Sequence, residues 1–85
     1  MNTKLITVDG VLTVSAKPGE IEERSASINS VGFQIKELIE DDEDSYIFDI
    51  EKEVKSQAEA ITSFVQLITF PWIALYDISI TKRIV

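Results

Sequence analysis

Histidine and cysteine, two residue types that dominate enzyme and metal chemistry, do not occur in this 85-residue sequence. Histidine is the usual general base near neutral pH and a very common ligand of zinc. Without either residue, the chain can form no Ser-His or Cys-His nucleophile pair and no common structural zinc site. These absences leave only carboxylate, lysine, tyrosine or hard-metal chemistry open to the protein.

Glycine is also scarce, and its three residues are Gly10, Gly19 and Gly32. Neither a phosphate-binding loop nor a dinucleotide-binding fingerprint can be written with glycines at these spacings. The lack of cysteine also excludes disulfides, which fits a reducing compartment. The amino-terminal segment lacks the apolar run of a signal peptide, so a cytoplasmic location is expected, or the host cytoplasm if the protein is viral.

The overall composition is that of a globular protein, with 45% apolar and 27% charged residues. At this length we expect a single domain, residues 1–85, with a small hydrophobic core. Folding of so short a chain buries only roughly 60% of the surface that the unfolded chain exposes. So small a domain has little room for a catalytic cleft. The sequence therefore predicts that the protein is not an enzyme and binds no cofactor.

The amino-terminal segment predicts a β-hairpin. Two runs rich in β-branched residues, 4–8 and 11–16, flank Asp9-Gly10. Asp-Gly between such runs is a strong signal for a type I′ turn, because both central positions of that turn need positive φ. We therefore expect two strands, at about 4–8 and 11–16.

The segment that follows Pro18-Gly19 supports two interpretations. Its apolar residues recur at helical spacing and the acids near Glu20 suit a helix amino terminus, but its serines and Gly32 disfavour a helix. From Val31 onward the apolar residues alternate instead. We expect a short helix or an irregular segment to about residue 30, and then a strand over 31–39.

A second hairpin and a long helix are predicted next. Residues 41–44 form a turn by composition, and 45–50 alternate as a strand. From 51 to 70, apolar residues at helical spacing form one stripe. The members of this stripe are Val54, Ala58, Ile61, Val65 and Ile68. Pro71 ends the helix, and the run at 72–80 is apolar on both faces in its first half, which predicts a central strand.

Together these elements predict an α+β fold with the order β-β-(α)-β-β-α-β. The simplest arrangement is a small antiparallel sheet of four to five strands, with the helix at about 51–70 packed on one face. The apolar run at 64–76 is shorter than the about 20 residues needed to span a membrane, so no membrane association is expected.

The negative charge is concentrated in one segment. The whole chain carries −7, whereas residues 37–53 contain nine acids and one base, Lys52, and so carry −8. One interpretation is an acidic turn that keeps the protein soluble and protects an edge strand. The other is a binding surface for a basic partner, which would relieve the repulsion among clustered like charges. The residues predicted to contact such a partner are Glu37, Glu40, Asp41, Asp42, Glu43, Asp44, Tyr46, Asp49, Glu51 and Glu53.

Metal and nucleic-acid sites have less support in the sequence. The acids at 41–44 and Asp49 offer hard oxygen ligands, but consecutive acids in a turn point apart and the calcium-loop pattern is absent, so no metal site is predicted. The basic residues are scattered and the pI is about 4.4, which argues against direct nucleic-acid binding.

The aromatic residues divide into two groups. Trp72, Tyr76 and their aromatic neighbours surround the expected helix-to-strand corner, and we expect most of them in the core. Tyr46 and Phe48 lie beside the acidic turn, where an exposed ring could anchor a partner, because aromatic residues are common at binding hot spots.

The leading hypothesis is a non-catalytic inhibitor or modulator whose acidic surface occupies a basic surface on a larger partner. A nucleic-acid-handling enzyme is the natural partner, because such enzymes carry large basic surfaces. In size, charge and lack of catalytic groups, the chain resembles the small acidic proteins with which bacteriophages and mobile elements block host nucleases, including anti-restriction and anti-CRISPR inhibitors. That resemblance implies competitive occlusion, with carboxylates in the place of DNA phosphates.

Two alternatives stay open. One is a ligand-sensing or oligomerisation module that forms a homodimer through an exposed face of its sheet and buries Trp72 or Tyr76. The other is a subunit of a structural assembly such as a virion. Self-association distinguishes both alternatives from the inhibitor.

Overall fold

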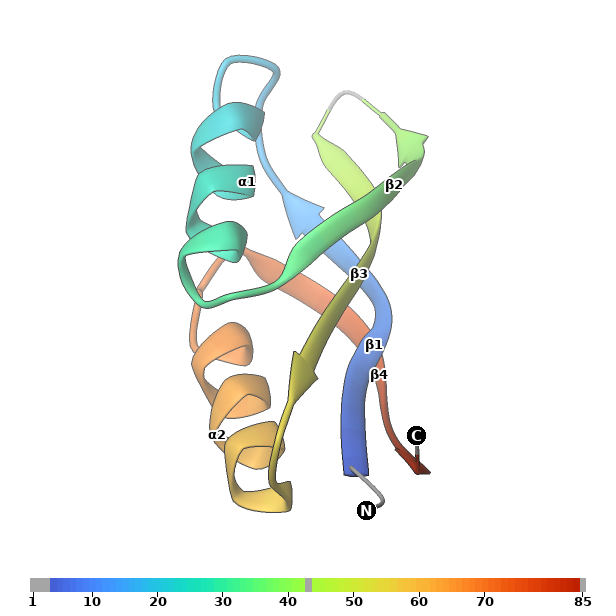
Figure 1. The fold of residues 1–85 in the computed structure, drawn as a ribbon. Coiled ribbons are helices and arrows are strands. Elements are labelled where there is room, and N and C mark those ends of the chain that lie inside the picture. Colours follow the sequence, from blue (N-terminus) through green and yellow to red (C-terminus); the bar gives the residue numbers. More distant parts are fainter. Residues whose placement is uncertain (1–3, 43, 85) are drawn as a thin grey trace.

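A four-stranded antiparallel sheet organises the fold, and the two helices lie on the same face of it (Figure 1). The computed structural model describes residues 4–42 and 44–84. The elements along the chain are β1 (Lys4–Ser15), α1 (Ile21–Ser30), β2 (Gln34–Asp41), β3 (Ser45–Val54), α2 (Gln57–Ile68) and β4 (Ile73–Ile84). The strand order in the sheet is β2-β3-β1-β4. The predicted α+β class is thus confirmed, with four strands and two helices.

The predicted hairpin at residues 4–16 is wrong, because these residues form one continuous strand, β1. This strand pairs with β3 on one side and β4 on the other, and both ladders run through Asp9 and Gly10. The apolar residues explain the difference. Ile6, Val8 and Leu12 are all buried at even positions, and only an unbroken strand keeps them on one face. A two-residue turn at Asp9-Gly10 would place Leu12 on the face opposite Ile6 and Val8.

Gly10 does not form a turn; it allows β1 and β4 to approach each other closely. A Cβ atom at this position would collide with the backbone carbonyl oxygen of Asp77 and would lie 2.8 Å from the Cα atom of Ile78. The φ angle of Gly10 is +156°, which residues with side chains rarely adopt. Glycine therefore lets β4 pack closely against the middle of β1.

Helix α2 is shorter than the helix predicted at about 51–70, because residues 51–54 continue β3. Its amino terminus is set by Ser56, whose side chain accepts a hydrogen bond from the backbone N–H of Glu59 at 3.1 Å. The Glu59 carboxylate in turn accepts from the backbone N–H of Lys55 at 3.3 Å. This reciprocal arrangement is close to a capping box, which satisfies backbone donors that the first turn leaves free.

The predicted apolar stripe does not face the core. The buried residues of α2 are Ala60, Ser63 and Leu67, whereas Ile61 and Val65 are 51% and 48% exposed. The prediction failed because it took its phase from Val54, which is buried but belongs to β3. The stripe that continues along the helix lies about 100° around its axis from the buried residues.

The final strand is an edge strand, so its predicted central position is also wrong. β4 pairs with β1 alone among the described strands. Its apolar residues are correspondingly open to solvent, with Leu75 68% and Tyr76 50% exposed. Burial between two neighbouring strands therefore does not explain why this strand is apolar on both faces.

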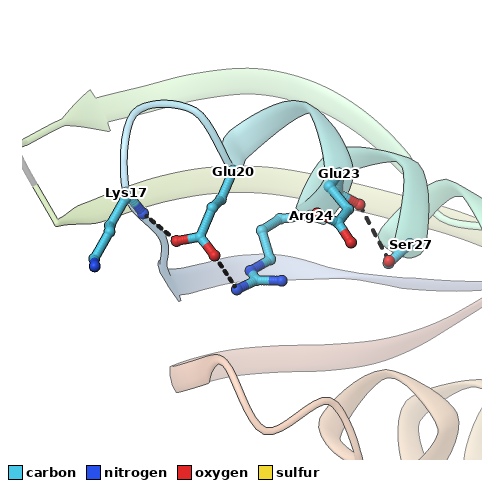
Figure 2. Close-up of polar contacts among 5 residues, drawn as sticks. All are labelled: Lys17, Glu20, Glu23, Arg24 and Ser27. Atoms are coloured by element: carbon cyan, nitrogen blue, oxygen red, sulfur yellow. Dashed lines mark hydrogen bonds and ion pairs between the residues drawn. The ribbon is translucent and has the colours of Figure 1, made fainter.

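A layered contact ties α1 to the connection between α2 and β4. The guanidinium carbon of Arg24 lies 5.2 Å from the ring centroid of Trp72, and that ring stacks on Phe70 at 4.6 Å. The Glu20 carboxylate holds Arg24 at 3.2 Å and also accepts the backbone N–H of Lys17 at 3.0 Å (Figure 2). Stacking of a guanidinium on an aromatic ring adds attraction beyond area burial.

The hydrophobic core fills the space between the sheet and the helices. Its residues come mainly from even positions of β1 and β3, with contributions from both helices and from the connection that precedes β2. The buried apolar residues are Ile6, Val8, Leu12, Val14, Ala16, Ile28, Phe33, Tyr46, Phe48, Ile50, Val54, Ala60 and Leu67. Helices and core therefore occupy one side of the sheet.

Thr7 is a weak point on the other side of the sheet. It is only 6% exposed, and its hydroxyl oxygen has no hydrogen-bond partner. We expect Thr7→Val to raise the free energy of unfolding by roughly 1 kcal/mol, because valine keeps the volume and removes a buried, unsatisfied hydroxyl. Urea denaturation measures the change. Thr81→Val, at an exposed position, should stay within about 0.5 kcal/mol of the parent, and a loss of stability in Thr7→Val would contradict this assignment.

Candidate functional site

The face of the sheet opposite the helices is the candidate site. On β1, β3 and β4 it is formed by odd-numbered residues, since side chains alternate between the two faces of a strand. Odd positions of β3 such as Asp49 and Glu51 are partly exposed, whereas the even positions Phe48 and Ile50 are buried on the helix side. No described helix covers this face (Figure 1).

Carboxylates from all four strands meet on the open side of the sheet. Glu37 of β2 pairs with Asp49 of β3, which lies opposite Val11 of β1, and Val11 lies opposite Asp77 of β4. In the next row, Glu51 of β3 lies opposite Asp9 of β1, and Glu53 follows in the third row. We call this surface the acidic face and define it by six residues: Asp9, Glu37, Asp49, Glu51, Glu53 and Asp77.

Two pairs of carboxylates lie directly opposite each other on neighbouring strands. These pairs are Glu37 with Asp49 and Asp9 with Glu51. Neighbouring strands are about 4.8 Å apart, and two like charges about 5 Å apart repel by roughly 1 kcal/mol even in water. Like charges in directly opposite positions lower sheet stability. The acidic face is therefore an arrangement that folding alone disfavours.

One cation partly compensates this surface. Lys36 lies at an irregularity of the β2–β3 register, between the paired residues Ile35 and Glu37. Its Nζ atom lies 3.3 Å from the Glu51 carboxylate, and both side chains are partly exposed. An exposed ion pair of this kind contributes about 0–1 kcal/mol, so it offsets at most one of the two repulsive pairs.

The other base of the region, Lys52, is engaged on the opposite side of the sheet. Its Nζ donates hydrogen bonds to the backbone carbonyl of Val31 at 2.9 Å and to the Ser63 hydroxyl at 2.8 Å. It also lies 5.8 Å from the Phe33 ring centroid. Lys52 thus links β3, α2 and the connection before β2, and it does not face the carboxylates. The predicted helix over about 51–70 included Lys52, which is wrong because residue 52 belongs to β3.

The structure brings together only part of the predicted binding residues. Glu37, Asp49, Glu51 and Glu53 share the acidic face. Asp42 and Asp44 are exposed in the connection between β2 and β3, beyond the end of that face. Glu40 and Asp41 lie in β2, with side chains outside the described part, and Glu43 lies outside the described residues altogether.

Tyr46 does not provide the exposed aromatic anchor that the sequence suggested. It is only 5% exposed on the helix side of β3, and Phe48 is 4% exposed. Their rings lie 6.5 Å apart and nearly parallel, at 12°. Both residues belong to the hydrophobic core, so neither presents a ring beside the carboxylates.

Sequence reasoning missed two members of the acidic face, Asp9 and Asp77. Asp9 was assigned to a turn, whereas the structure places it in the middle of β1. Asp77 belongs to a strand far away in the sequence and joins the site only because β4 pairs with β1. Alternation in an unbroken β1 could have placed Asp9 on the open face. No signal in the sequence shows that β4 neighbours β1, so Asp77 could not have been found.

A shallow hollow of about 440 Å³ adjoins the acidic face where β2 begins. Glu51 and Glu53 line it together with Lys36, Lys52 and two neutral residues. It lies where β3 extends past the first residue of β2, since Gln34 is opposite Glu51. Its two carboxylates are balanced by its two lysines, and Lys36 already pairs with Glu51, so the hollow adds no net negative charge to the acidic face.

No group of three or more acidic residues in the described ranges is arranged to hold a metal ion. Nor does any helix within those ranges combine the length and the apolar composition that crossing a membrane requires. Compared with protein-family models, with curated proteins and with solved structures, the chain matches none of them. Its function must therefore be inferred from the residues themselves.

Proposed function

We propose that this chain is a non-catalytic binding protein whose acidic face covers a basic surface on a larger protein. The observation that carries the proposal is that two pairs of acids occupy directly opposite positions on neighbouring strands, Glu37 with Asp49 and Asp9 with Glu51. Local arrangements that oppose folding are expected mainly at functional sites. A partner rich in lysine and arginine would convert this repulsion into attraction and would be steered towards it.

A nucleic-acid-handling enzyme is the partner class that best fits the charge spacing. Alternate residues on a strand lie about 6.8 Å apart, so six carboxylates in three rows give roughly one charge per 3.4 Å. One strand of DNA carries about the same linear charge density, whereas the duplex carries one charge per roughly 1.7 Å. The acidic face is therefore a better substitute for one phosphate backbone than for a whole duplex.

The proposed mechanism is competitive occlusion. The carboxylates pair with lysine and arginine side chains that otherwise hold phosphates, and the uncovered sheet presents them on a rigid surface. Inhibition of a nuclease follows because its substrate cleft is occupied. A phage or mobile-element inhibitor of a host defence nuclease is the kind of protein to which this mechanism belongs.

Displacement of a labelled oligonucleotide from purified nucleases tests this function. The panel contains a restriction endonuclease, an RNA-guided nuclease and a ribonuclease, each bound to fluorescent single- or double-stranded substrate. We expect the protein to displace substrate from at least one of them, and to do so less well as salt rises from roughly 50 to 200 mM. Polyglutamate at equal total charge serves as the control for unspecific polyanion competition.

Two results would contradict the proposal. One is a complete lack of displacement from every enzyme of the panel at low salt. The other is displacement that polyglutamate reproduces at the same charge concentration, because a folded acidic face would then add nothing to bulk charge.

A further inference from the structure

The two edges of the sheet differ in how well they are protected. The β2 edge has two register irregularities, one between Ile35 and Glu37 and one between Leu38 and Glu40. Its sequence carries three acids and one lysine. Bulges and charges of this kind are common devices against edge-to-edge pairing. The edge is therefore protected, although Leu38 and Ile39 are exposed there.

The β4 edge lacks these protections over most of its length. β4 has 12 residues and one register irregularity, opposite Thr13 and Val14 near its start. From Leu75 to Thr81 it contains a single charge, Asp77, and no proline. Leu75, Tyr76 and Ile80 are all more than a third exposed. A long, regular and apolar edge of this kind is a template for another strand.

The exposed side of α2 continues the apolar surface beyond this edge. Ser63 of α2 contacts Lys52 of β3, and Phe64 contacts Tyr76 of β4 with ring centroids 5.4 Å apart. Successive residues of a helix are rotated by about 100°, so the step from Ser63 to Phe64 turns from β3 towards β4. A further turn in the same direction reaches Ile61 and Val65, which lie beyond Phe64 on the helix surface. These half-exposed residues therefore project past the β4 edge on the helix side of the sheet.

We propose that a second copy of this chain pairs with β4 in antiparallel orientation around a two-fold axis, forming an eight-stranded sheet. Because both copies keep their helices on one side, the two α2 helices pack against each other through Ile61 and Val65. Twelve strand residues and one side of a 12-residue helix supply on the order of 20 residues per partner, which is the size of a standard interface.

Charge and register favour the chain's own copy as the occupant. β4 carries one acid and two bases, so it is the edge least repelled by a second molecule of a protein with net charge −7. A two-fold axis at Ile78 places Tyr76 opposite Ile80 of the other copy, and Asp77 opposite Ser79. Aromatic and β-branched pairs stabilise antiparallel strands, and no acid faces an acid in this register. The acidic faces stay uncovered, so this dimer does not depend on the proposed function. Because it buries Tyr76, self-association through β4 is compatible with an inhibitor as well as with an oligomerisation module, and the displacement assay separates these two functions.

Analytical ultracentrifugation tests the dimer with two variants of equal net charge, −5. The first, Val65→Lys/Ile80→Lys, places charges in the proposed interface, and the second, Leu38→Lys/Ile39→Lys, places them on the β2 edge. We expect the parent and the β2 variant to sediment at twice 9.6 kDa, and the β4 variant to dissociate at least 100-fold more readily. Both variants reduce repulsion between copies, so selective loss of the dimer reports lost contacts.

Disulfide formation gives a second measurement that does not depend on the folding of the lysine variants. The chain has no cysteine, so Ile78→Cys introduces a single thiol at the proposed axis. Opposite Cα atoms in antiparallel strands are about 4.5–5.5 Å apart, within disulfide range. We expect oxidation to cross-link this variant but not Leu38→Cys. A parent that stays monomeric up to about 1 mM, or equal cross-linking of both cysteine variants, would overturn the proposal.

Discussion

Gly10→Ala is expected to destabilise the protein by about 3 kcal/mol or more, or to prevent folding, because of steric collision and backbone strain. The added Cβ atom would collide with the Asp77 carbonyl oxygen, which belongs to the backbone of β4 and cannot rotate away. Relief requires β4 to separate from β1 at the centre of the sheet, where the two strands are paired on either side of this position. Urea denaturation followed by circular dichroism measures the loss.

Gly19→Ala is the matched control for this substitution. A Cβ atom at Gly19 meets nothing within 4 Å, and this glycine has no positive φ. Its replacement should be neutral or stabilise by about 0.4–1 kcal/mol through the unfolded state. If Gly10→Ala were as stable as Gly19→Ala, the close approach of β1 and β4 would be wrong. Such a result would favour a hairpin turn at Asp9-Gly10.

Asp9→Asn/Asp49→Asn is expected to change stability and binding in opposite directions. The substitutions remove one charge from each like-charge pair and leave the ion pair between Lys36 and Glu51 intact. Loss of the repulsion in both pairs should raise the free energy of unfolding by up to about 2 kcal/mol, or about 1 kcal/mol for each pair. Loss of two contacts to basic side chains, at roughly 1 kcal/mol each, should weaken partner binding about 30-fold.

A gain in stability together with a loss of partner binding would show that the carboxylates serve binding and are not required for the fold. If the carboxylates were required for the fold, the variant would lose stability, and any weaker binding would follow from that loss. Two measurements on the same preparation decide between these explanations: denaturant unfolding, and titration against a nuclease of the panel from which the parent protein displaces substrate. Loss of stability in Asp9→Asn/Asp49→Asn would contradict the interpretation of the acid–acid pairs.

The prediction for β1 failed because the hairpin rule for Asp-Gly was applied to four residues without regard to the apolar pattern of the whole segment. Asp9-Gly10 is a strong hairpin signal over four residues, but the buried apolar residues on both sides of it all fall at even positions: Ile6, Val8, Leu12 and Val14. Parity over the whole segment predicts one strand, and it was available in the sequence. The local turn preference lost because the burial of four apolar side chains on one face outweighs it.

The start of α2 was also present in the sequence. Ser56 and Glu59 have the spacing of a capping box, and the alternation of Tyr46, Phe48 and Ile50 continues in phase to Val54. Both signals place the strand-to-helix boundary near residue 56. The helix was predicted to begin too early because Val54 fits the helical spacing of the apolar residues as well as the alternation of the strand.

The acidic face could be predicted only in part. Glu37, Asp49, Glu51 and Glu53 were included by the charge count over residues 37–53, but that count included the acids at 40–44 as well and could not separate the two groups. The contribution of Asp77 depends on the pairing of β1 with β4, two strands at opposite ends of the chain. Local sequence carries no information on such long-range pairing, because any strand with suitable apolar residues satisfies the same pattern. The apolar run of β4 accordingly suggested a central strand.

The most direct test of the proposed function compares three variants of equal net charge, −5, in the oligonucleotide-displacement assay. Asp9→Asn/Asp49→Asn changes the acidic face, Asp42→Asn/Asp44→Asn changes the β2–β3 connection, and Glu22→Gln/Glu23→Gln changes α1. We predict that only the first variant loses displacement, about 30-fold relative to the parent. Equal losses in all three would show that net charge alone is responsible, and selective loss in the second would move the binding surface to the connection.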